Sequence, residues 1–184
     1  EELLADYRRD GALRTAMPIV AEPDLAASAD PSTLGDAPPT VAAAVRALLE
    51  TLAEGDYFAI LAYLPPDSAI REGLQRIRAS VRDALGNATT GGIGPRYLHS
   101  TGQLHKGGPN SGVYLMLTAD PLRDLPIPGR AESFGTLIAA QAAGDLAALQ
   151  RRGRRVLRLH AADAQSGLAR VTQLVGEALG SPVG

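Results

Sequence analysis

The chain has 184 residues, of which 45% are hydrophobic and 21% are charged, a balance typical of a globular domain. Its formal net charge of -2 argues against a sequence-independent nucleic-acid binder, which would present a basic surface to phosphates. The absence of cysteine excludes disulfides and thiolate metal sites, and no apolar run is long enough for a membrane span. We therefore expect a cytoplasmic protein with no nucleic-acid or membrane partner.

Residues 1–39 are expected to form a short helix and a linker arm. Leu3 and Tyr7 can share one side of a helix at the start of the chain. Residues 18–40 are rich in Pro, Ala, Ser and Asp and show neither helical nor strand periodicity. We predict an irregular arm there, followed by a compact domain at residues 40–184.

The compact part begins with a helix that Thr40 can cap, because apolar residues then recur at steps of three and four. Residues 57–64 (YFAILAYL) form an apolar run that stops at two prolines, which suits a buried parallel strand. An amphipathic helix follows from Asp67 or Ser68. The later predicted elements are strands at 112–118 and 155–160 and helices at 133–152 and 167–179.

Strands that alternate with helices in this way predict βαβ units and a parallel sheet covered on both faces. The predicted fold class is therefore α/β, a three-layer αβα sandwich with a mainly parallel sheet. Ligands of such sheets bind beyond the carboxyl ends of the strands, here near residues 64–69, 119–132 and 161–166. His160 ends a predicted strand, where it could contact a ligand or serve as a structural histidine.

The densest group of polar side chains lies in residues 91–112 (GGIGPRYLHSTGQLHKGGPNSG). This segment contains two of the three histidines, the only lysine and seven glycines. Glycine allows a ligand to approach the backbone closely, so the composition suggests an anionic, hydroxyl-rich ligand. The segment matches neither a phosphate loop nor a dinucleotide fingerprint.

The sequence HSTGQ, residues 99–103, resembles the HSMGQ-type segment of bacterial phosphoglucose isomerases. The longer strings GPRYLHSTGQLHKGGPNSG, IPGRAESFGTLIAAQAAGD and GRRVLRLH resemble the C-terminal part of bifunctional transaldolase/phosphoglucose isomerase fusions, over residues 40–180. The resemblance implies a sugar-isomerase (SIS-like) domain of a glucose-6-phosphate isomerase, which interconverts glucose 6-phosphate and fructose 6-phosphate.

The resemblance also implies roles for individual residues. His99 matches the histidine that opens the sugar ring, and Gln103 matches the glutamine beside it. A neutral imidazole, with a pKa near 6.5, can move a proton between the ring oxygen and the C1 hydroxyl. No metal or redox cofactor is required, because the hydrogen moves as a proton. The expected substrate contacts are Ser100, Thr101, His105 and Lys106. The last two could bind phosphate or could equally form a solvated flank of the loop.

Two family residues are not matched in this chain. The family's catalytic glutamate precedes the ring-opening histidine, but the corresponding stretch ALGNATTGG contains no carboxylate, and Asp83 is the nearest acid. The family's late lysine falls near Thr172 or Gln173. Either other residues have taken these roles, such as Lys106 for the amine, or this chain is one half of a site. We expect the second, with little or no activity from the chain alone. The implied partners are a first isomerase subdomain and a transaldolase domain in the same parent chain, and a second copy in a homodimer.

Two other interpretations remain open at this point. The chain could be a non-catalytic module that binds sugar phosphates, or a structural dimerisation half that completes a site elsewhere. For His99 the structural alternative is a histidine that tethers a glycine-rich loop. Because the chain begins at Glu1 without an initiator methionine, we expect a fragment of a longer protein.

Overall fold

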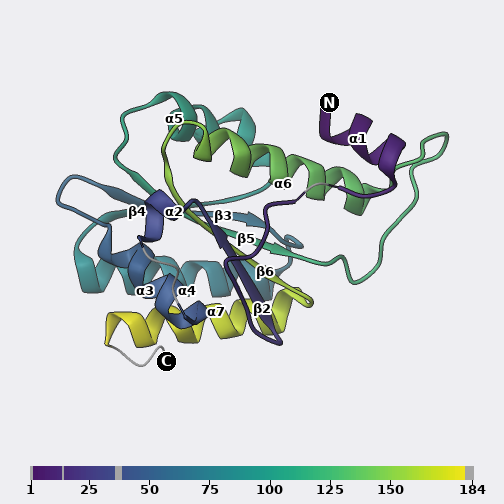
Figure 1. Cartoon of the computed structure of the whole chain (residues 1–184). Helices are drawn as coiled ribbons and strands as arrows, with labels where there is room; N and C mark the ends of the chain where they lie inside the picture. The colour runs from purple at the N-terminus through teal and green to yellow at the C-terminus, as the bar shows by residue number, and fades with distance from the viewer. Residues whose placement is uncertain (1, 14, 36–38, 181–184) are drawn as a thin grey trace.

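The computed structural model describes residues 2–13, 15–35 and 39–180, which fold around a six-stranded sheet. The strand order is β1-β2-β6-β5-β3-β4, and helices cover both faces of the sheet (Figure 1). The predicted three-layer α/β sandwich is confirmed. In chain order the elements are α1 (Glu2–Asp10), β1 (Val20–Ala21), β2 (Leu25–Ala29), α2 (Pro31–Leu34), α3 (Val41–Glu50), β3 (Tyr57–Tyr63), α4 (Ser68–Leu85), β4 (Ala88–Ile93), the 3-10 helix η1 (Arg96–His99), α5 (Thr101–Gly107), β5 (Gly112–Ala119), α6 (Phe134–Gln150), β6 (Arg155–Ala161) and α7 (Ala164–Leu179).

The parallel part of the sheet contains all three strands that the sequence predicts. β3 pairs in parallel with β4 on one side and with β5 on the other, and β5 pairs in parallel with β6. The helices that pack on these strands begin at side chains that accept a backbone N–H, which satisfies one of the free donors of each first turn. These N-cap residues are Thr40, Asp67, Ser133 and Asp163.

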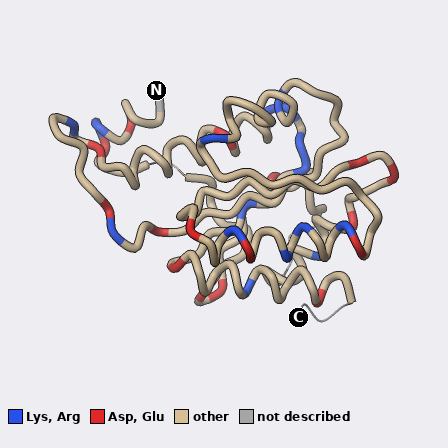
Figure 2. The backbone as a smooth tube through the Cα atoms, turned by 180° about the vertical axis from the view of Figure 1, so that it is seen from behind, with Lys and Arg blue, Asp and Glu red and all other residues tan. Residues whose placement is uncertain are grey.

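Alternating residues of each strand build the two hydrophobic cores. On β3, Phe58 and Ile60 pack against α3, α4 and α7, whereas Leu61 and Tyr63 pack against α6 and η1 on the other face. Figure 1 shows α3, α4 and α7 below the sheet and α1, α5 and α6 above it. In Figure 2 the layer of α4 and α7 carries charges of both signs, while the strands between the layers are almost uncharged. None of the described helices is long and apolar enough to cross a membrane.

The prediction of an irregular arm at residues 18–40 is wrong for part of that segment. β1 and β2 form a hairpin-like pair, and β2 runs antiparallel to β6 with Ala27 opposite Leu159. Leu25 and Ser28 are buried in the same strand. β2 consists mainly of alanine and serine, so it carries no strong hydrophobic alternation, and its pairing with β6 stabilises it. The sheet therefore extends across the domain boundary expected at residues 39 and 40.

The stretch 86–111, expected to be a long loop, also contains regular structure. Its first part is the edge strand β4, and η1 and α5 follow. Two of its glycines are required by packing. A Cβ atom on Gly92 would lie 2.6 Å from the side chain of Tyr97, and one on Gly94 would lie 2.6 Å from the ring of Tyr63.

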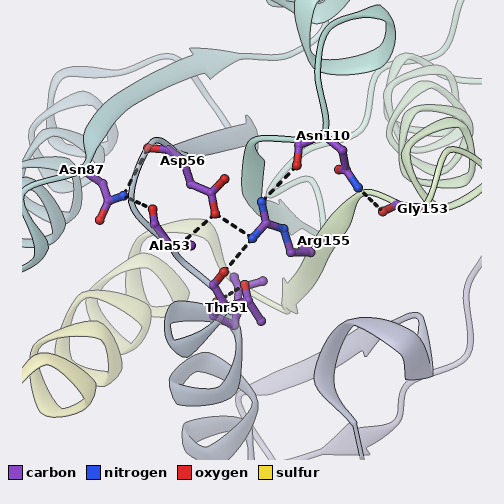
Figure 3. Close-up of polar contacts among 8 residues, drawn as sticks. Thr51, Ala53, Asp56, Asn87, Asn110, Gly153 and Arg155 are labelled. Atoms are coloured by element: carbon purple, nitrogen blue, oxygen red, sulfur yellow. Dashed lines mark hydrogen bonds and ion pairs between the residues drawn. The ribbon is translucent and has the colours of Figure 1, made fainter.

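A polar network holds together the edge of the sheet where the parallel strands begin (Figure 3). Nη1 of Arg155, at the start of β6, donates to Asp56 Oδ2 at 2.7 Å and to the carbonyl of Thr51 at 2.6 Å. Nη2 donates to the carbonyl of Asn110 at 3.3 Å. The Arg155 guanidinium lowers the pKa of Asp56, because its hydrogen bond favours the charged carboxylate. These contacts make Arg155 a structural residue at the amino-terminal edge of the sheet.

Candidate functional site

The HSTGQ segment lies on the surface, on the α6 side of the sheet. His99 is the last residue of η1, and α5 begins two residues later. The side chains of His99, Ser100, Thr101 and Gln103 are all exposed. Among the described residues, the imidazole of His99 makes no hydrogen bond, ion pair or ring contact. His99 is thus available to a ligand or to another protein surface.

A buried carboxylate fixes the segment to the rest of the domain. Asp145 of α6 accepts a short hydrogen bond from the hydroxyl of Tyr97 in η1 and a 3.4 Å bond from Tyr63 of β3. Nζ of Lys106, in α5, lies 2.6 Å from the other carboxylate oxygen of Asp145. The Asp145 side chain is only 2% exposed, so Lys106 compensates a charge that would otherwise be buried alone. Burial and the nearby Asp145 charge raise the pKa of both tyrosines, which therefore remain donors.

A second set of contacts holds α5 against the sheet. His105 is 2% exposed, and its Nδ1 lies 3.0 Å from the hydroxyl of Tyr57. That hydroxyl lies 2.7 Å from the hydroxyl of Tyr114, which donates in turn to the backbone carbonyl of His105 at 3.3 Å. Burial lowers the pKa of His105, and the Asp145 charge opposes this in part. The imidazole is therefore neutral near pH 7 and belongs to the core.

The six candidate site residues predicted from the sequence thus fall into two groups, four exposed residues and two that pack inward. His99 and Gln103 lie in the exposed part of η1 and α5, with Ser100 and Thr101 between them in the chain. His105 and Lys106 turn inward and anchor the segment that carries the other four. The imidazole of His105 is buried, whereas the side chain of Lys106 is 26% exposed and paired with Asp145. Their role as substrate contacts stays a prediction.

The structure identifies no replacement for the unmatched family residues among the residues it describes. Asp83 lies at the exposed end of α4, paired with Arg82 at 2.7 Å, and α4 packs on the opposite face of the sheet from η1. Thr172 is buried in α7, where its hydroxyl donates to the carbonyl of Leu168 at 2.8 Å. No group of three or more His, Cys, Asp or Glu residues that could hold a metal ion occurs in residues 2–13, 15–35 and 39–180.

At the carboxyl edge of the sheet lies a group of polar residues whose proximity was not predicted from the sequence. His160 lies there at the end of β6, half-buried, and its Nδ1 is 3.0 Å from the hydroxyl of Thr118 at the end of β5. Arg158 precedes His160 by two residues and lies on the same face of β6. The alternation of polar and apolar residues in RVLRLHA was the available signal, because it places Arg158 and His160 on one face.

Comparisons with known proteins support the fold alone. No family model matches the chain, and no curated protein matches it. One solved structure with the same fold is the hypothetical protein TT0462 from Thermus thermophilus, with a TM-score of 0.61 and 17% sequence identity. The match covers 83% of this chain and 43% of that one, so this chain spans less than half of the length of its neighbour. The class defined by fold and site is a three-layer α/β domain with an exposed histidine segment.

Proposed function

We propose that this chain is the C-terminal sugar-isomerase domain of a glucose-6-phosphate isomerase and that His99 is its ring-opening residue. The observation that carries the proposal is the exposed, unbonded imidazole of His99 within a segment that resembles the HSMGQ type. A histidine that tethers a loop needs a bonding partner, and His99 has none among the described residues. The three-layer α/β fold is the one that the resemblance implies.

The proposed step is an acid–base exchange at the sugar ring. His99 takes the proton of the C1 hydroxyl as the C1 carbonyl forms, the bond between C1 and the ring oxygen breaks, and the ring oxygen receives a proton. An imidazole can both accept and donate a proton in this way, which suits general acid–base catalysis. Gln103 and the hydroxyls of Ser100 and Thr101 would hold the sugar phosphate beside it.

The next step, transfer of the C2 proton to C1, needs a base from elsewhere. The exposed group formed by residues 99–103 contains no carboxylate. In our proposal the base and the phosphate-binding loop come from a first isomerase subdomain of the parent chain, which would also carry a transaldolase domain, or from the second copy in a homodimer. The missing carboxylate also favours the alternative that this domain binds a sugar phosphate or dimerises without catalysis.

A coupled assay that follows glucose 6-phosphate formation from fructose 6-phosphate tests the proposal. The full parent chain should turn over at the rate of an ordinary enzyme, between about 1 and 10³ s⁻¹. The chain described here should stay below about 1 s⁻¹ by itself. A parent without isomerase activity would contradict the function, and an active isolated chain would contradict the half-site.

A further inference from the structure

A separate pocket lies on the α6 side of the sheet, beyond the ends of β3, β5 and β6. Its volume is about 360 Å³, and its walls come from the strand ends, the connection after β4 and the first half of α6. Most of the wall is apolar, and the side chains of Tyr63, Pro65, Ile93 and Ile138 contribute to it. His99 and Gln103 are not among the residues that line it.

One end of the pocket is polar, and its side chains form a chain of hydrogen bonds. Nε of Arg158 donates to Oγ1 of Thr118 at 3.1 Å, and this Oγ1 lies 3.0 Å from Nδ1 of His160. Nε2 of His160 lies 3.5 Å from Oδ1 of Asp120. If Thr118 donates to Nδ1, then His160 carries its proton on Nε2, toward Asp120. Each group in the chain then has a donor matched with an acceptor.

The terminal nitrogens of Arg158 are the unused donors of this arrangement. In the part of the chain that the structure describes, its guanidinium bonds only through Nε and forms no ion pair. Asp120 attracts it from a distance, but that carboxylate is 67% exposed and closer to His160. Burial lowers the pKa of Arg158 and of His160, because the charged forms lose water. An anion in the pocket would give the Arg158 guanidinium a charged partner in place of the water it has lost. The planar guanidinium can also bond both oxygens of a carboxylate or phosphate at once.

We propose that this pocket binds a small organic anion, with its carboxylate or phosphate group on the terminal nitrogens of Arg158 and its apolar body between the strand ends and α6. The proposal does not depend on the isomerase function. A sugar phosphate presents hydroxyls along its whole length, whereas the walls here offer mainly carbon atoms. The ligand should therefore differ in class from the substrate proposed for His99.

Titration of the 184-residue chain with small probes, followed by amide NMR shifts, tests this assignment. Benzoate and phenyl phosphate carry the two head groups on the same ring, and benzamide is a neutral match for benzoate. We expect the better of the two anions to bind with a dissociation constant at or below about 1 mM, and benzamide to bind at least about tenfold more weakly. The relative affinities of benzoate and phenyl phosphate decide the head group. Equal binding of benzamide, or no binding of either anion, would overturn the proposal.

Variants locate the binding within the molecule. Arg158→Gln should weaken benzoate or phenyl phosphate by about tenfold or more, whereas Arg82→Gln, on the far side of the sheet, should not change it. Ile138 is 40% exposed at the pocket, so Ile138→Glu should keep the fold and repel the anion, with Ile138→Gln as its neutral control. Unchanged affinity in both Arg158→Gln and Ile138→Glu would contradict the site. Displacement of the probe by fructose 6-phosphate would contradict a ligand class separate from the isomerase substrate.

Discussion

Two histidines of one short segment have opposite environments. His99 is exposed and unbonded among the described residues, while His105 is buried against Tyr57 and Tyr114. Both follow a glycine-rich stretch, and both are candidate site residues in the sequence, His99 as the ring-opening residue and His105 as a substrate contact. Only the structure separates the residue that is free to react from the residue that supports it.

We predict that His105→Ala lowers the free energy of unfolding by about 2–4 kcal/mol, because it leaves a cavity and removes one of the two hydrogen-bond partners of the Tyr57 hydroxyl. His99→Ala should change it by less than about 0.5 kcal/mol, as is usual for exposed positions. Urea denaturation of the two variants measures both values. Similar losses in the two variants would contradict the structural division.

The pH dependence of stability gives a second readout of His105. Its pKa is lowered in the folded state, so the unfolded state binds more protons between the two pKa values. Stability should be complete above the unfolded pKa of about 6.5 and should fall as the pH drops below it. His160 has a lowered pKa too and acts in the same direction. The His105→Ala variant should therefore show a shallower, but not flat, decline. An unchanged decline would show that His105 is not buried in its neutral form.

At the scale of elements, β2 differs most from the prediction, because it belongs to the sheet and not to an irregular arm. It covers the edge of β6, and Ala27 is completely buried there. An unpaired edge strand with apolar neighbours is a template for aggregation. The pairing of β2 with β6 therefore protects the sheet as well as extending it.

We predict that a truncated chain starting at residue 40 aggregates or fails to fold, because β6 becomes an open edge. A chain that starts at residue 18 keeps β1 and β2 and should remain monodisperse. Size-exclusion chromatography and circular dichroism of the two truncations measure this. A well-folded monomer from the shorter chain would show that residues 18–39 are dispensable, as a linker would be.

The sequence predicts the elements whose stability comes from their own pattern. β3 and β5 are continuous apolar runs, and α3 and α4 have clear caps and apolar stripes, so their predicted bounds fall within a few residues of the observed ones. β2 and β4 consist mainly of Ala, Ser, Thr and Gly, and they exist because a neighbouring strand pairs with them. Pairing of distant segments is not encoded in local periodicity.

The same reasoning explains how much of the site was predictable. The resemblance identifies His99 and Gln103, and the structure leaves both exposed. It does not separate them from His105 and Lys106, because the partners of those two residues, Tyr57 and Asp145, lie far away in the sequence. The polar end of the pocket requires the register of β5 against β6, which only the folded sheet provides.

At the scale of the whole molecule, the two candidate ligand surfaces lie on the same side of the sheet. The connection after β4 links them, since Arg96 lines the pocket and His99 ends the same 3-10 helix. The other layer, formed by α3, α4 and α7, contributes a hydrophobic core and a charged exterior. The α6 side therefore carries the proposed ligand chemistry, and the opposite side supports it.

The most direct test of the central claim is the rate of the parent enzyme with His99 replaced by alanine, measured on cyclic and on open-chain sugar phosphate. Because His99 is proposed to open the ring, turnover of the cyclic substrate should fall by about 10² to 10⁴-fold, the usual contribution of general acid–base catalysis. Turnover of substrate supplied in the open-chain form should be much less affected, since proton abstraction follows ring opening. Equal losses on both forms would contradict the ring-opening role, and full activity in the variant would remove His99 from the site.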